Sequence, residues 1–235
     1  MDNATLASQL QDRLGLERHA IGLSFVQSRP DGVHQTSAVV PSACTFWALG
    51  DEGVFYAAAD QHYNCPIGAM TMGFDMPQEV EGDLMSLVQK MCADRYISEQ
   101  EPASIPGVTK PKEGIVYGPL GRLPVEPDLI LLWLDPTQAM LFNEAAGSAT
   151  WADSMTPALY GRPTCAALPV ALAEGRPTMS LGCIGMRTFT GVAADKMLAV
   201  VPAAEADRFA SALGTTVDAN AEMKQFYEGR RAQFA

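Results

Sequence analysis

The chain has 235 residues, of which 48% are hydrophobic and 18% charged, a composition typical of a globular protein with a sizeable core. Its formal net charge of −11 argues against binding to nucleic acid or to an anionic membrane surface, because both require a basic face. The N-terminus shows no targeting signal, and the longest apolar run, residues 129–134, is too short to span a bilayer. The five cysteines do not resemble a secreted disulfide framework, so we expect a reducing, cytoplasmic location.

The first part of the chain alternates between helix and strand patterns. Leucines at helical spacing predict an amphipathic helix over residues 3–18, which a strand over 20–26 and a Pro-Gly turn at 29–32 follow. A second strand is expected at 53–58, and it leads directly into the stretch HYNCP at 62–66. Early acidic residues and a helical apolar period predict a helix over 78–91.

The second part begins with a loop rich in proline and glycine, residues 102–114, which is the best candidate for a domain boundary. We nevertheless expect a single domain over residues 1–235, because the cysteines lie on both sides of this loop. Strands are expected at 114–118 and 128–133, and the second leads through a proline at the first helical position into a helix over 137–146.

A similar strand–proline–helix order recurs near the C-terminus, with a strand at 196–201, Pro202 and a helix through residue 213. The two units could be an internal duplication, although the pattern is generic. A last helix is expected over 219–234. These elements together predict an α+β or α/β fold, in which helices flank a mixed sheet.

Four of the five cysteines lie among glycine and proline residues, and they are the first candidates for a functional site. These are Cys44, Cys65, Cys165 and Cys183. Soft thiolate ligands suit zinc and iron–sulfur clusters. The separations of 21, 100 and 18 residues contain no Cys-x-x-Cys pair of the kind that marks structural zinc, and they are compatible with a cluster built across a folded core. The fifth, Cys92, ends the predicted helix and is interpreted as a small buried hydrophobic residue.

Two further interpretations of these segments remain open. Because His62 precedes Cys65 by three residues, an imidazolium next to the thiol could make Cys65 the nucleophile of a thiol enzyme. Arg187, shortly after Cys183, could bind an anionic ligand or form a structural salt bridge. Alternatively, the cysteine loops line a metal-free pocket for a small molecule or a tetrapyrrole.

Several segments resemble a known family. They are FYAAADQHYNCPIGA at 55–69, PDLI at 127–130 with the following QAM at 138–140, RPTCAALP at 162–169 and SLGCIG at 180–185. Together they resemble domain of unknown function 169, also called ArCR, over nearly the whole chain. The family pattern carries cysteines matching Cys44, Cys65, Cys165 and Cys183 and none matching Cys92, so the resemblance selects the same four thiols.

The leading hypothesis is therefore an iron–sulfur protein whose cluster, preferably [4Fe-4S], is held by the four thiols. His62, Tyr63, Asn64 and Arg187 would then lie around the cluster or contact a substrate. A small-molecule substrate or a redox partner protein is expected, and a homo-oligomer is allowed. The sequence does not distinguish an enzyme from an electron carrier.

Overall fold

The computed structural model describes residues 1–147 and 159–234. Its strands are β1 (Ile21–Val26), β2 (Phe55–Ala58), β3 (Gly114–Pro119), β4 (Leu129–Leu134), β5 (Leu159–Tyr160), β6 (Thr178–Ser180) and β7 (Met197–Pro202). The α-helices are α1 (Asn3–Leu14), α2 (Ala43–Leu49), α3 (Pro66–Met72), α4 (Gln78–Ala93), α5 (Glu101–Ser104), α6 (Pro136–Ala145), α7 (Ala167–Glu174), α8 (Ile184–Phe189) and α9 (Ala206–Arg231). Short 3-10 turns are η1 (Ala59–His62), η2 (Leu120–Arg122), η3 (Thr164–Ala166) and η4 (Ala203–Glu205).

The strands form one open sheet in the order β2-β3-β1-β4-β7-β6-β5. Every pairing between named strands is antiparallel except β5 with β6, so the sheet is mixed. Of the two fold classes that the sequence allows, the structure shows α+β. Strands β2 and β3 pair although the 102–114 segment lies between them in the chain, so the sheet continues across that candidate boundary.

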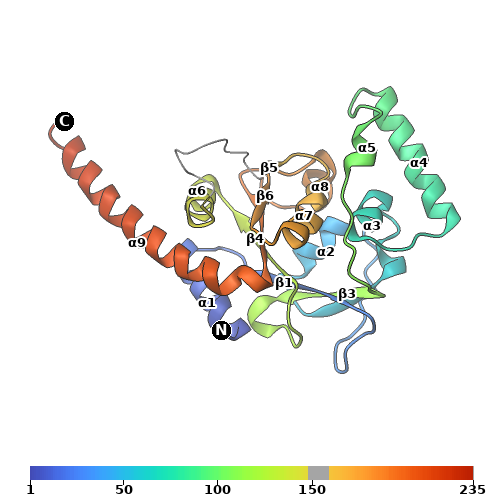
Figure 1. Cartoon of the computed structure of the whole chain (residues 1–235), viewed down its shortest axis with the longest axis horizontal. Coiled ribbons are helices and arrows are strands. Elements are labelled where there is room, and N and C mark those ends of the chain that lie inside the picture. Colours follow the sequence, from blue (N-terminus) through green and yellow to red (C-terminus); the bar gives the residue numbers. More distant parts are fainter. Residues whose placement is uncertain (148–158, 235) are drawn as a thin grey trace.

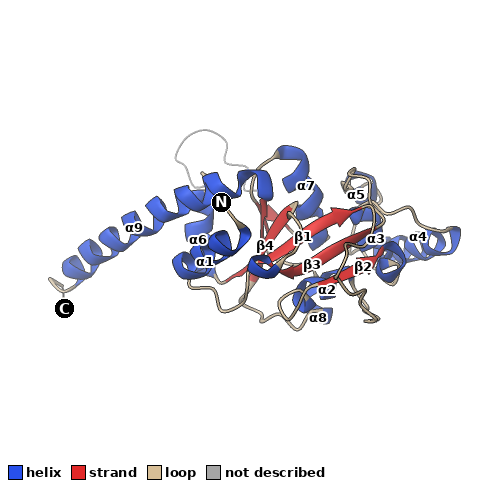
Figure 2. Cartoon of the chain, turned by 90° about the horizontal axis from the view of Figure 1, so that it is seen from below, coloured by secondary structure: helices blue, strands red, loops and turns tan. Residues whose placement is uncertain are grey.

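Helices cover both faces of the sheet (Figures 1 and 2). Strand β4 illustrates the reason: Leu129, Leu131 and Trp133 face one core, and the alternate residues of the strand face the other. Because successive side chains of a strand point to opposite faces, a continuous apolar run is what a strand buried on both sides requires. Helices α2, α3, α7 and α8 contribute to the first core, and α1, α6 and α9 to the second.

The expected strands and most expected helices are confirmed within one or two residues. The first helix ends at Leu14, short of the expected residue 18, because Gly15 adopts the left-handed conformation (φ 61°) that terminates helices. The two strand–proline–helix units lie side by side, with β4 antiparallel to β7 and α6 in contact with α9. The expectation of two helices after Pro202 is wrong in one respect, since α9 runs unbroken through residues 214–218.

Helix α4 differs from the other long helices, since none of its residues is fully buried. It extends from one end of the molecule, beside α5 (Figure 1). Cys92, near its end, is half-buried, so the interpretation of Cys92 as a buried hydrophobic residue is wrong. No helix in the described part of the chain is long and apolar enough to cross a membrane.

Candidate functional site

Each of the four predicted ligands lies at the beginning of a helical segment. Cys44 is in the first turn of α2, Cys65 is the N-cap of α3, Cys165 lies in η3, which leads into α7, and Cys183 is the N-cap of α8. Local sequence explains two of these starts. The Ser42 hydroxyl accepts a hydrogen bond from the Cys44 N–H, and Pro66 occupies the first turn of α3, where its missing N–H costs nothing.

These segments come together on one side of the sheet. Helix α2 contacts both α3 and α8, and α3 contacts η3. The Cys183 N–H donates a 2.6 Å hydrogen bond to the Thr164 hydroxyl, which ties the start of α8 to the turn that carries Cys165. The fold therefore gathers all four cysteine-bearing segments, although they span 140 residues of sequence from 44 to 183.

A glycine makes the closest of these approaches feasible. A Cβ atom added at Gly68 would lie 2.6 Å from the Cβ of Ala43, which is too close for real atoms, and 3.0 Å from the Cys65 Sγ, which is a tight contact. Gly68 thus lets α3 approach the beginning of α2, one residue before Cys44. A glycine permits this approach because it has no Cβ atom.

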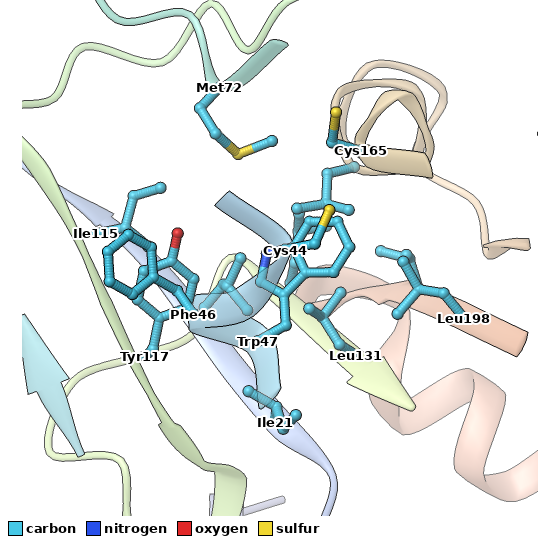
Figure 3. Packing of buried hydrophobic residues seen from close by; sticks show 14 of the residues in the cluster. Ile21, Cys44, Phe46, Trp47, Met72, Ile115, Tyr117, Leu131, Cys165 and Leu198 are labelled. Atoms are coloured by element: carbon cyan, nitrogen blue, oxygen red, sulfur yellow. The ribbon is translucent and has the colours of Figure 1, made fainter. Parts of the chain in front are cut away.

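The four thiols differ in burial. Cys44 and Cys165 are buried and belong to the first core, whereas Cys65 and Cys183 are half-buried. Figure 3 shows Cys44 and Cys165 on two different helical segments in the core that also contains Leu131 and Leu198. We call Cys44 and Cys165 the inner thiols and Cys65 and Cys183 the outer thiols, because the second pair lies nearer to solvent.

The electrostatics of the inner thiols reflect both burial and their neighbours. Burial raises the pKa of Cys44 well above its usual value, and charge on Cys165, Cys65 or Cys183 would raise it further. Burial also raises the pKa of Cys165 to about 12; a hydrogen bond with Thr71 opposes this rise, and Cys65 and Cys183 add smaller increases. Both inner thiols are therefore protonated at neutral pH in the metal-free protein.

The thiols are near one another, but they do not form a ready site for one metal ion. Among residues 1–147 and 159–234, no three side chains of His, Cys, Asp or Glu are arranged to hold a single ion. All five cysteines are free thiols.

His62 lies in the core rather than beside a solvent-accessible thiol. It is 1% exposed, and its ring lies 4.9 Å from that of Phe46 and 4.8 Å from that of Phe74. Its Nδ1 is 2.8 Å from the Ala58 carbonyl, so Nδ1 carries the proton and Nε2 accepts from the Tyr117 hydroxyl at 3.0 Å. Burial lowers the pKa of His62 to about 4. The imidazolium that the thiol-enzyme hypothesis requires is therefore absent at neutral pH.

Tyr63 and Asn64, which lie between His62 and Cys65, have different surroundings. The Tyr63 hydroxyl donates a 2.7 Å hydrogen bond to the Asp75 carbonyl, and its ring packs against the first core, so it fixes the turn before Cys65. Asn64 is exposed, immediately before the half-buried Cys65. Of the three residues that precede Cys65, Asn64 is the one placed to meet a molecule from solvent.

Arg187 has a structural role that the sequence did not reveal. Its guanidinium donates to the carbonyls of Ala193 and Ala194, at 3.1 Å each, and to the carbonyl of Leu181. Arg187 thereby connects the segments that precede and follow α8. Its partners are backbone carbonyls, not the carboxylate that a salt bridge would require. These bonds hold the loop that carries Cys183.

Two residues of the site were not singled out from the sequence. Tyr117 of β3 is fully buried, and its pKa is raised well above the usual value by burial and, secondarily, by Cys44. Trp133 of β4 is 3% exposed, and its indole N–H has no hydrogen-bond partner in the described residues. Both residues lie inside apolar strand patterns, which indicate buried core residues. The only signal that could have singled them out is the polar atom that each side chain carries.

The fold and the site define an α+β protein with a mixed sheet and four cysteines gathered on one face. A family model described as domain of unknown function 169, uncharacterised ArCR, matches residues 9–212, so the chain belongs to this family. The comparisons with curated proteins and with solved structures gave no match.

Proposed function

We propose that this protein binds one iron–sulfur cluster, preferably [4Fe-4S], through Cys44, Cys65, Cys165 and Cys183. The observation that carries the proposal is the convergence of four thiols from four separate helical starts in a largely apolar core. A set of ligands made only of sulfur suits iron–sulfur clusters. Binding to a cluster would convert the two buried thiols to thiolates, and the iron would neutralise their charge inside the apolar core.

A cluster and a single metal ion require different spacings of their sulfur ligands. A tetrahedral zinc site with Zn–S distances of about 2.3 Å brings its sulfur atoms to within about 3.8 Å of one another. The other three cysteines each contribute to the raised pKa of Cys44, so they lie near it, yet the described residues form no site for one ion. In a cluster each thiolate binds a different iron, so its ligands stand farther apart.

The surrounding residues have specific tasks in this proposal. Cys44 and Cys165 would have to release their protons on binding. The unpaired indole N–H of Trp133, which belongs to the same core as these two thiols, would find an acceptor in a thiolate or a sulfide. When bound, the cluster would supply electron transfer if all four thiolates bind it, or a Lewis-acidic iron if only three do.

The exposure of the outer thiols indicates where a partner would approach. Cys65 and Cys183 are half-buried, and Leu181 and Ile184, which flank Cys183, are 52% and 65% exposed. An apolar surface beside the site suits a redox partner protein, and the exposed Asn64 suits a small-molecule substrate. Five free thiols fit a reducing, cytoplasmic environment.

The test is the iron and acid-labile sulfide content of the full chain after anaerobic reconstitution. We expect about four irons and four sulfides per chain, and a broad absorption near 400 nm. Serine substitution of each of the four cysteines should lower the content by at least half, whereas Cys92→Ser, the matched control, should leave it unchanged. An iron content that stays the same in all four serine variants would contradict the proposal. A chain that binds no iron, and whose cysteine variants differ only in stability, would favour the metal-free binding module.

A further inference from the structure

The C-terminal half of α9 leaves the body of the protein as an uncovered arm. Figures 1 and 2 both show it extending away from the sheet and the other helices. The buried residues of α9 end at Leu213, and every residue from 221 to 234 is exposed. We call residues 217–234 the C-terminal arm; it lies beyond residue 212, where the family match ends.

The arm is not a simple solvated tail, because it carries large apolar side chains. Phe226 and Tyr227 are 58% and 61% exposed, with ring centroids 5.6 Å apart, and Met223 is 46% exposed. Between the arm and α6 lies a groove of about 510 Å³, lined by Met140 and Leu141 of α6 among others. An exposed apolar surface of this kind, next to a groove, is typical of an interaction site.

The outer part of the helix has no buried side chains in a single copy. The arm joins the body through Gly214, Thr215 and Thr216, which are weak helix formers. Val217 still packs against the second core and the Asn220 amide donates to the Glu144 carboxylate of α6, but residues 221–231, the last eleven of the 26-residue helix, are all exposed. Contacts from another molecule would supply the stabilisation that the arm lacks in a single copy.

The order of charges along the arm suits a second copy of the same arm. Asp218 and Glu222 stand near its beginning and Arg230 and Arg231 at its end, while Lys224 and Glu228 pair with each other at 4.0 Å. Two antiparallel arms would place the acidic beginning of one against the basic end of the other. Parallel arms would set like charges against each other. An anionic membrane is disfavoured, because the six charged residues of the arm sum to zero.

We propose that the C-terminal arm is a dimerisation device, which pairs antiparallel with the arm of a second copy of this chain. In this pair, apolar side chains of one arm cover Phe226 of the other, together with Met223 and Tyr227, which line the groove beside α6. Such pairing is isologous, since the same patch serves both copies and the assembly closes at two.

The test is sedimentation velocity on the full chain at concentrations from 1 to 100 µM. We expect the wild-type chain to sediment at about twice its mass of 25.1 kDa. Replacement of both aromatic residues, Phe226→Glu with Tyr227→Glu, should weaken self-association at least tenfold. The control is Met85→Glu, at a residue of α4 that is 57% exposed, and it should leave self-association unchanged.

Charge reversal tests the antiparallel order. Arg230→Glu with Arg231→Glu should weaken the dimer, and adding Asp218→Arg and Glu222→Arg should restore it, because complementary ends then face each other again. A wild-type chain that stays monomeric at 100 µM would overturn the proposal. So would a dimer that the aromatic substitutions leave intact, or one that the first pair of charge reversals strengthens.

Discussion

Gly68 is the residue at which the two helical starts carrying Cys44 and Cys65 come closest. We expect Gly68→Ala to cost about 1–3 kcal/mol in the free energy of unfolding, because the added methyl group would overlap Ala43 and the Cys65 sulfur. It should also lower the iron content after reconstitution, because the two thiols are pushed apart.

Gly82 provides the matched control, since it is a helical glycine of α4 with nothing within 4 Å of an added Cβ. Gly82→Ala should stabilise the chain slightly, by up to about 1 kcal/mol, because alanine is the better helix former. Urea unfolding of the two variants compares them directly. Equal stabilities would show that α2 and α3 are not in contact at Gly68.

His62 gives the protein a pH dependence at the acidic end. Its pKa is lowered from 6.5 to about 4 in the folded chain, so the unfolded chain binds this proton more tightly. The stability due to the neutral histidine is thus fully present above pH 6.5 and is lost as the pH falls towards 4. The loss amounts to about 3 kcal/mol, at 1.36 kcal/mol for each pKa unit.

The measurement is the free energy of unfolding at several pH values between 4 and 7. The His62→Gln variant should lose about 3 kcal/mol less than wild type over this range, whereas His34→Gln, at an exposed histidine, should follow the wild-type curve. Parallel curves for His62→Gln and wild type would mean that His62 is not held neutral by the core.

At the residue scale the sequence identified the ligand candidates but not the tasks of their neighbours. The local glycine and proline pattern and the family resemblance both select Cys44, Cys65, Cys165 and Cys183, and the fold brings their segments together. His62 stood three residues before Cys65, and sequence spacing cannot show that its ring turns inward to Tyr117. The same holds for Arg187, whose carbonyl partners are backbone atoms without a side-chain signature.

At the scale of elements, long periodic segments were predictable and short ones were not. Strand β6 and helix α8, with three and six residues, escaped detection because nearby glycines and prolines indicate loops. A helix ending at residue 213 was expected, but α9 continues through Gly214, where an added Cβ would meet the Arg13 guanidinium of α1. That glycine is therefore explained by a packing contact between helices rather than by a helix end.

Gln138 connects two elements and gives a prediction at this scale. Its amide nitrogen donates to the carbonyls of Leu14 and Gly15 at the end of α1, and its oxygen accepts from the Asp135 N–H at the start of α6. Gln138→Ala should cost roughly 2 kcal/mol or more in urea unfolding, because buried backbone groups lose their partners. Gln78→Ala, at an exposed first residue of α4, is the control and should change stability by less than about 0.5 kcal/mol. A Gln138 variant as stable as this control would contradict the assigned contacts.

At the scale of the whole molecule, the sheet separates the two sites for which functions are proposed. The face covered by α2, α3, α7 and α8 carries the cysteines, and the opposite face carries α1, α6 and the root of the C-terminal arm. The sheet also divides lengthwise: β2-β3-β1 comes from residues 21–119, and β4-β7-β6-β5 from residues 129–202. Cys44 and Cys65 belong to the first half and Cys165 and Cys183 to the second, so a shared cluster would link the two halves.

The most direct test of the four-cysteine centre is a Mössbauer spectrum of the full chain reconstituted anaerobically with iron-57 and sulfide. The proposal predicts a single four-iron cluster signal with sulfur-ligated iron in the wild-type chain and in Cys92→Ser, and its loss in Cys44→Ser and Cys165→Ser. A spectrum of mononuclear iron in the wild-type chain, or a cluster signal that persists when Cys44 and Cys165 are both replaced, would contradict it.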